Sequence, residues 1–195
     1  MTQWIQLMNA RYRIAFLDRD GVINRKLPEG AFVSRWEDFD LLPGVAHAIA
    51  RLNQAGFLVL VVSNQRGISL GKYTARDVSA IHQQLQSELN KNHAHIDAFY
   101  VCPHDNGQCD CRKPLPGLFL QAKAEFPQIE WDASLIIGDA RADVQAGKAL
   151  GMFTIFVNAR GENQKPGWQE AAAQADMVVS SLPDAIEAVL DARLP

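Results

Sequence analysis

The sequence predicts an α/β protein, a Rossmann-like doubly wound parallel sheet with helices on both faces. Short apolar runs alternate along the chain with longer segments whose apolar residues recur at helical spacing. This alternation is typical of strand–helix–strand units, which right-handed crossovers join into a parallel sheet. Three of the apolar runs end on polar residues, and the carboxyl ends of parallel strands meet at one edge of a sheet. We therefore expect one domain over residues 1–195, with a functional site at that edge.

The first predicted strand is residues 14–17, an apolar run of the kind that is buried on both faces of a parallel sheet. It is followed directly by Asp18-Arg19-Asp20-Gly21, in which the glycine permits a sharp turn. Residues 25–36 are polar and irregular, so we expect a loop or flap beside the two acids.

The later elements follow in the order that such a sheet requires, without a repeat or a break in composition. The predicted strands are residues 57–62, 98–102, 134–137, 153–157 and 177–179. The predicted helices are residues 44–56, 74–90, 114–126 with proline in the first turn, 140–150 and 182–194, and residues 161–174 are expected to be part loop and part helix. These elements leave no room for a large cap domain.

Acidic residues follow two of the predicted strands. Asp18 and Asp20 come after the first strand, and Asp139 ends the strand 134–137, with Asp143 one helical turn further on the same face. Carboxylates this close repel unless a cation lies between them, and Mg²⁺ prefers such oxygen ligands. Asp18 could also attack an electrophile, and Asp20 could donate or accept a proton. The alternative is an Asp-rich turn after a strand, with Asp139 capping a helix and Asp143 exposed.

Two further residues are candidates for binding an anion. Ser63 ends the strand 57–62, where its hydroxyl and the following N–H groups could hold a phosphoryl oxygen. Lys113 precedes Pro114 at a predicted helix start, where the helix dipole and the ammonium group would both attract an anion. The plain alternatives are a capping serine and a solvated surface lysine.

The three cysteines are clustered, as Cys102-Pro103-His104 followed by Cys109-Asp110-Cys111. Three thiolates and an imidazole can form a closed tetrahedral Zn²⁺ site, which is structural rather than catalytic. An odd, clustered count also fits a metal site better than a disulfide framework. We therefore expect a zinc loop over residues 102–111 that fixes the position of Arg112 and Lys113, rather than free thiols near a chance histidine.

Composition excludes several classes of protein. The net charge is −3, which does not suggest a nucleic-acid or membrane-surface partner. Residues 1–11 contain no apolar core of signal-peptide length, and no run approaches the length of a membrane span. We therefore expect a cytoplasmic monomer. The run from Gly67 to Tyr73 is similar to a nucleotide-binding P-loop, but its glycine spacing is one residue short and Tyr73 replaces the metal-binding hydroxyl.

Taken together, these pieces resemble the haloacid dehalogenase superfamily of phosphohydrolases over residues 14 to about 157. Four motifs stand in the family's order, and each lies at a predicted strand or helix end. They are Asp18-Arg19-Asp20-Gly21, Ser63-Asn64-Gln65, Lys113, and Gly138-Asp139 with Asp143.

The resemblance implies a chemistry for these residues. Asp18 would be the nucleophile that forms an aspartyl-phosphate, and Asp20 the general acid and then base. Mg²⁺ would be held by Asp18, Asp139 and the main-chain carbonyl of Asp20, with Asp143 orienting this shell. Ser63, Asn64 and Lys113 would bind the phosphate.

Within this superfamily, the Cys-x-His and Cys-x-Cys-Arg-Lys-Pro pattern resembles the zinc-bearing branch. That branch includes the heptose 1,7-bisphosphate 7-phosphatases and the histidinol-phosphate phosphatases. Residues 33–44 and 63–67 are more similar to the heptose enzymes, whereas the short spacer 105–108 is more similar to the histidinol type.

The resemblance implies a small phosphorylated metabolite as substrate, first a heptose bisphosphate and second histidinol phosphate. Arg112 is the candidate for contacting the part of the substrate beyond the reacting phosphate, and Arg35 and Arg66 are weaker ones. A third hypothesis is a zinc-stabilised binding module without catalysis, although every acid of the catalytic set is present.

Overall fold

The computed structural model describes residues 13–159 and 166–191, and six strands in these ranges form one parallel sheet in the order β3-β2-β1-β4-β5-β6. The chain moves outward from β1 to β3 and then returns to β4 on the other side of β1. The order therefore reverses between β1 and β4, where open α/β sheets bind their ligands. The strands are β1 (Ile14–Leu17), β2 (Leu58–Asn64), β3 (Ala98–Cys102), β4 (Ser134–Gly138), β5 (Phe153–Val157) and β6 (Met177–Val179).

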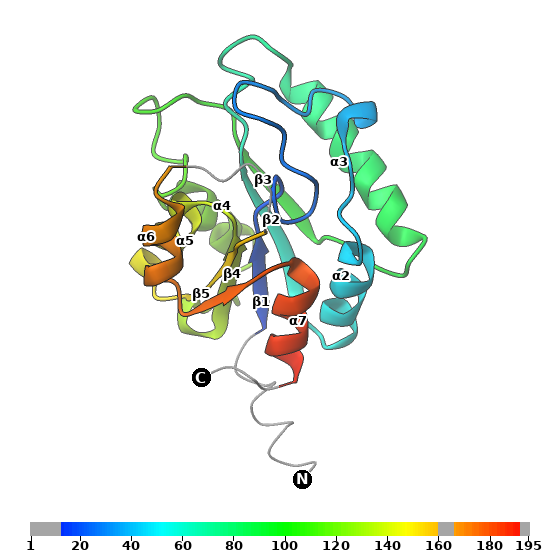
Figure 1. Cartoon of the computed structure of the whole chain (residues 1–195), viewed down its shortest axis with the longest axis vertical. Coiled ribbons are helices and arrows are strands. Elements are labelled where there is room, and N and C mark those ends of the chain that lie inside the picture. The colour runs from blue at the N-terminus through cyan, green and yellow to red at the C-terminus, as the bar shows by residue number, and fades with distance from the viewer. Residues whose placement is uncertain (1–12, 160–165, 192–195) are drawn as a thin grey trace.

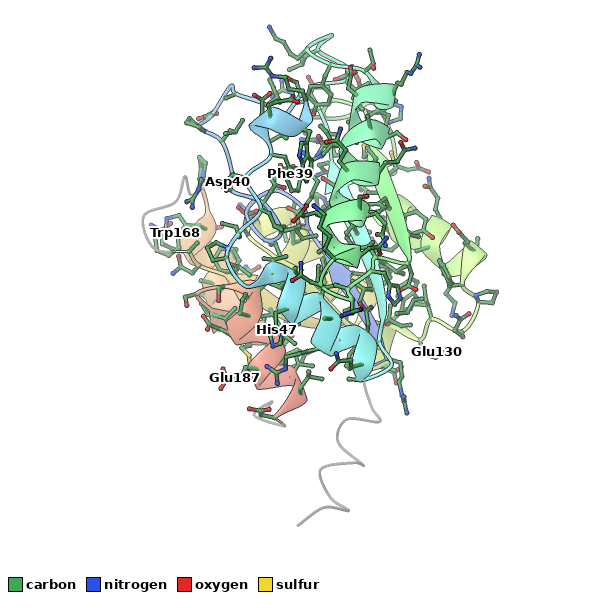
Figure 2. All side chains as sticks on the ribbon, turned by 90° about the vertical axis from the view of Figure 1, so that its right-hand side faces the viewer. Phe39, Asp40, His47, Glu130, Trp168 and Glu187 are labelled. Carbon is green, nitrogen blue, oxygen red and sulfur yellow. The ribbon has the colours of Figure 1, made fainter. Side chains whose placement is uncertain are left out.

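Helices cover both faces of this sheet, as the sequence predicts (Figure 1). One face carries α2 (Val45–Gln54), α3 (Ala75–Asn90) and α7 (Leu182–Leu190). The other carries α4 (Gly117–Glu125), α5 (Arg141–Leu150) and α6 (Trp168–Gln174). Helices α2 and α7 lie side by side, as His47 of α2 and Glu187 of α7 mark in Figure 2.

The core is divided between the two faces because successive strand residues point to opposite sides. In β1, Ala15 and Leu17 pack with α2, α3 and α7, whereas Ile14 and Phe16 pack with α4 and α5. All four are buried, which explains why the run shows no polar alternation. Leu17 pairs with Val61 of β2 and with Ile137 of β4, so β1 and β4 end at nearly the same level, whereas β2 continues three residues further.

Several element boundaries differ from the prediction. Strand β2 continues through Ser63 and Asn64, because both residues pair with β3. The last helix ends at Leu190, and residues 192–194 of its predicted range lie outside the described residues. Of the predicted segment 161–174, residues 161–165 also lie outside them, and residues 168–174 are helical.

The predicted start of the helix 114–126 is wrong, because α4 begins at Gly117. The main-chain N–H of Gly117 donates to the carbonyl of Asp110, 3.1 Å away, and a Cβ at residue 117 would lie 2.7 Å from that oxygen. Residues 113–116 precede the helix, so Lys113 lies four residues before its first residue and not directly at its start.

The loops that frame the site lie above one edge of the sheet. In Figure 1 the blue segment between β1 and α2 and the green segment after β3 both lie beyond the carboxyl ends of the strands. The blue segment contains the short helix η1 (Trp36–Asp38), and η2 (Trp131–Ala133) precedes β4. Over the described residues no cap domain is inserted, and no helix is long and apolar enough to cross a membrane.

Candidate active site

Three of the predicted acids gather at the point where the strand order reverses. Asp18 follows β1 directly, Asp139 follows β4, and Asp143 lies in the first turn of α5. One carboxylate oxygen from each lies within 4.8 Å of the others. The pairing of β1 with β4 accounts for this, because it brings the two strand ends together.

Two glycines allow the acids to approach one another. A Cβ on Gly138 would lie 2.2 Å from the Cβ of Asp143, and a Cβ on Gly21 would lie 2.3 Å from Oδ2 of Asp139. Gly21 also has a φ of +94°, a left-handed conformation that favours glycine. The glycines of these two motifs are therefore required by close packing around Asp139 and Asp143.

Lys113 is buried between two of the acids. Its Nζ lies 3.0 Å from Oδ1 of Asp18 and 2.6 Å from Oδ1 of Asp143, and it donates to the carbonyl of Val62. Burial alone would lower the pKa of Lys113, but the charges of Asp143 and Asp18 outweigh it and raise the pKa above the ordinary value. The ammonium group is therefore charged at neutral pH and faces the acids, as the sequence predicts.

A second lysine at the site was not predicted. Lys26, in the loop after Asp20, is buried and forms an ion pair with Oδ2 of Asp139. The sequence offers little to identify it, because its loop has no periodic pattern and its partner lies more than a hundred residues away. Its position indicates that the flap contributes a positive charge directly to the acid cluster.

Asp20 is not part of this three-acid cluster, and its carboxylate is held by four hydrogen bonds. Arg19 Nη2 donates to both of its carboxylate oxygens at 2.9 Å, Asn24 donates to Oδ1, and Gln65 donates to Oδ2. Burial opposes ionisation of this carboxyl, but the charge of Arg19 and the hydrogen bonds outweigh it and lower its pKa. The guanidinium carbon of Arg19 lies 6.0 Å from the ring centroid of Phe39, which Figure 2 shows after η1.

The two polar residues that end β2 have different surroundings. Ser63 is buried, and its Oγ accepts a hydrogen bond from Gln65. The side chain of Asn64 both accepts from the main-chain N–H of Lys113 and donates to its carbonyl, at 3.0 and 3.1 Å. Asn64, predicted to bind phosphate, therefore has its amide bonded to the segment that carries Lys113.

The predicted zinc ligands also come together. The Sγ atom of Cys102 lies 3.2 Å from that of Cys111, 3.6 Å from that of Cys109 and 3.8 Å from Nδ1 of His104. Burial raises the pKa of Cys102, and burial with the neighbouring sulfurs raises that of Cys111 to about 12. The hydrogen bonds of Cys109 lower its pKa to about 7 against the effect of burial.

The three arginines predicted to contact the substrate each bond to residues of the loops around the site. Arg112 donates to Asn106 at 2.8 Å and to the carbonyl of His104, so its guanidinium is held by the cysteine loop. Arg66 forms an ion pair of 2.7 Å with Asp105 in the same loop. Arg35 pairs with Asp38 at 3.3 Å, and its side chain is largely exposed.

Comparison with known proteins identifies the family. Residues 110–185 match the family described as HAD-hydrolase-like. D-glycero-β-D-manno-heptose-1,7-bisphosphate 7-phosphatase of Escherichia coli is 35% identical over 188 residues, which cover 92% of this chain and 95% of the relative. The chain belongs to this phosphatase family. The corresponding α-heptose enzyme of Mycobacterium tuberculosis is 44% identical over 131 residues, 67% of this chain and 68% of that protein.

The fold of this family is the one described above. The crystal structure of D,D-heptose 1,7-bisphosphate phosphatase from B. bronchiseptica, complexed with magnesium and phosphate, superimposes with a TM-score of 0.80. It is 30% identical in sequence, and the match covers 92% of this chain and 99% of that one. The predicted membership of the haloacid dehalogenase superfamily, and of its heptose phosphatase branch, is confirmed.

Proposed function

We propose that this phosphatase removes the 7-phosphate of D-glycero-D-manno-heptose 1,7-bisphosphate, with Mg²⁺, through an aspartyl-phosphate on Asp18. The observation that carries the mechanism is the contact between Asp18 and the buried Lys113, 3.0 Å apart, beside Asp139. A nucleophilic carboxylate next to a fixed positive charge is what phosphoryl transfer to an aspartate requires. The names of the full-length relatives support the substrate.

The acid cluster fits the metal ion that this mechanism uses. The donor set consists of carboxylate oxygens, the hard ligands that Mg²⁺ prefers, from Asp18, Asp139 and Asp143. Asp18 and Asp139 would bind the ion together with the main-chain carbonyl of Asp20, and Asp143 would keep its contact with Lys113. When bound, Mg²⁺ would neutralise the negative charge of the phosphoryl group.

The remaining chemistry is carried out by the protein's own side chains. A carboxylate oxygen of Asp18 bonds to phosphorus as the bond from phosphorus to the sugar oxygen breaks, and Asp20 gives its proton to that oxygen. Asp20 then takes a proton from water, whose oxygen bonds to the phosphorus and releases inorganic phosphate from Asp18. Asp20 is ionised in the free protein, and the negative phosphate entering beside it raises its pKa toward the protonated form that the first step requires.

Three further residues would assist the phosphoryl transfer: Ser63 and Asn64 at the end of β2, and Lys113 in the β3–α4 loop. The Lys113 ammonium and the Ser63 hydroxyl would donate hydrogen bonds to the phosphoryl oxygens. Asn64 is better explained as a positioning residue, because both polar atoms of its side chain hold the main chain of Lys113. In this proposal Asn64 positions Lys113 and does not itself bind the phosphate, whereas the sequence predicts that it does.

The cysteine loop fits a structural zinc ion. Ligands around tetrahedral zinc stand about 3.4–3.8 Å apart, given bond lengths of roughly 2.3 Å to sulfur and 2.0–2.1 Å to nitrogen. Four of the six separations among Cys102, His104, Cys109 and Cys111 are 3.2–3.8 Å, close to that range, and all four ligand atoms lie within 4.8 Å of one another. Zinc would deprotonate the thiols and hold the loop, and through it Arg112 and Lys113, in place.

A bisphosphate suits the rim of the site. Arg112 is anchored to the zinc loop next to Lys113, so its charge is available at a fixed place for the second phosphate. We assign it this role before Arg35 and Arg66, because Arg35 is largely exposed and Arg66 pairs with Asp105. A small sugar bisphosphate is therefore the expected substrate.

The experiment is phosphate release with Mg²⁺ from heptose 1,7-bisphosphate and from histidinol phosphate, for the wild type and for Asp18→Asn. We expect Asp18→Asn to lose phosphate release by at least about 10⁴-fold while circular dichroism and melting temperature show a folded protein. Full activity of this variant would contradict the mechanism. Faster turnover of histidinol phosphate would favour the alternative suggested by the short spacer 105–108. The absence of Mg²⁺-dependent turnover with any ester would favour a binding module.

A further inference from the structure

The side chain of Gln65 lies between the two groups that handle the proton and the phosphate. Gln65 follows β2 and is buried. Its Nε2 donates to Oδ2 of Asp20 at 2.9 Å and to Oγ of Ser63 at 2.8 Å. Both N–H bonds of the amide are therefore used, one on the acid/base residue and one on the phosphate-binding hydroxyl.

Two donors fix the orientation of this amide. The hydroxyl of Tyr73 donates to Oε1 of Gln65 at 2.7 Å, and Nη2 of Arg19 donates to the same oxygen at 3.3 Å. If the amide turned over, its NH₂ group would face these donors, and its oxygen would face the Asp20 carboxylate. The buried Gln65 side chain therefore has one stable orientation.

This orientation has a consequence for Ser63. A hydroxyl has one proton and two lone pairs, and the Ser63 oxygen already accepts from Gln65. Its proton is then directed away from Gln65 and can serve an oxygen of the phosphoryl group. Gln65 thus leaves the Ser63 hydroxyl proton available for donation to the phosphoryl group. Its second N–H holds the Asp20 carboxylate.

The contact from Tyr73 depends on a glycine in the same loop. A Cβ on Gly67 would lie 2.1 Å from the ring of Tyr73, so no other residue fits there without moving the ring. This explains the glycine–tyrosine segment that is similar to a P-loop in sequence: it places the Tyr73 hydroxyl against Gln65.

We infer that Gln65, oriented by Tyr73 and Arg19, is a positioning residue that sets Asp20 for proton transfer to the departing sugar oxygen and Ser63 for phosphate binding. The inference rests on the proposed function. It predicts that a loss of Gln65 affects poor leaving groups most, because an alkoxide needs the proton from Asp20 and a nitrophenolate hardly does.

The test compares hydrolysis of glycerol phosphate, an alkyl ester, with hydrolysis of p-nitrophenyl phosphate, both with Mg²⁺. For Gln65→Leu we expect kcat on the alkyl ester to fall about tenfold more than kcat on the aryl ester. A tenfold difference is what the loss of one hydrogen bond from Gln65 to Asp20 in the transition state should produce. In addition to this difference, we expect a smaller loss common to both esters, from the contact of Ser63 with the phosphoryl group and from the hydrolysis of the aspartyl-phosphate that both esters share. Tyr73→Phe should shift the ratio in the same direction but less, because Arg19 still donates to Gln65.

The matched control is Gln86→Leu in α3. The side chain of Gln86 also forms a hydrogen bond within the protein, because its Oε1 accepts from the main-chain N–H of Ile96. It should leave the ratio of the two rates unchanged. If Gln65→Leu does not fold, Tyr73→Phe decides by the same ratio. Equal losses on the two esters, or no loss, would overturn the inference, whereas a wild type that hydrolyses neither of these esters nor heptose 1,7-bisphosphate would overturn the proposed function and the inference with it.

Discussion

Lys113 is the residue that joins the stability of this protein to its chemistry. Its ammonium is buried between Asp18 and Asp143, so each charge compensates the desolvation of the others. The folded pKa of Lys113 is raised above its ordinary value of 10.5. The stabilisation is therefore fully present below pH 10.5 and is lost only as the pH rises through the folded pKa.

Replacing Lys113 with methionine should destabilise the protein by about 3–5 kcal/mol at pH 7, because two buried carboxylates lose their compensating charge. The loss should be smaller with millimolar Mg²⁺, which supplies positive charge to the same carboxylates. Urea unfolding with and without Mg²⁺ measures both. Lys148→Met, which removes a partly exposed partner of Asp176, is the control and should cost at most about 1 kcal/mol. A Lys113→Met variant as stable as the wild type would exclude this role.

Single residues differ in how far the sequence predicts them. Asp18 and Asp139 are predictable, because an apolar run that stops on an acid marks the end of a buried strand. Gln65 stands in a polar triplet at such an end, yet no pattern indicates that its amide links Ser63 to Asp20. Lys26 is not predictable, because its partner is brought to it only by the fold.

The segment between β3 and α4 links the cysteine cluster to the active site. It contains three of the predicted zinc ligands, and the fourth, Cys102, ends β3. It continues directly into Arg112 and Lys113, and Asn64 of β2 holds the main chain of Lys113. The cysteine spacing alone predicts the metal site. It does not predict that α4 begins late, because the bond between Gly117 and Asp110 that delays the helix is a contact of the folded loop.

Cys109→Ser should release the zinc, lower the melting temperature by about 10 °C and reduce turnover severalfold, although no catalytic group is changed. Zinc content by mass spectrometry should be one ion per wild-type chain. Asp110→Ser, an exposed neighbour in the same loop, is the matched control and should retain both zinc and activity. A wild type that is purified without zinc and is as stable as when zinc is added would contradict the structural role.

The whole molecule places its chemistry where the strand order reverses. The sheet and its helices follow from the alternation of apolar runs and helical periodicity, so the fold class, most strands and the no-cap architecture are predictable from sequence. The site requires more, because it combines residues from the ends of β1, β2 and β4, the flap and the β3–α4 loop. Sequence order suggests that these ends converge, but only the packed structure shows which side chains touch.

We propose that Asp18 is the nucleophile and that Mg²⁺ would bind between it and Asp139. The most direct measurement is a crystal structure of the wild type with Mg²⁺ and beryllium trifluoride, which mimics a phosphoryl group on aspartate. We expect beryllium bonded to a carboxylate oxygen of Asp18, Lys113 donating to a fluoride, and Mg²⁺ about 2.1 Å from oxygens of Asp18 and Asp139. Beryllium on another side chain, or Mg²⁺ bound away from these two acids, would show that Asp18 is not the nucleophile of a shared magnesium site.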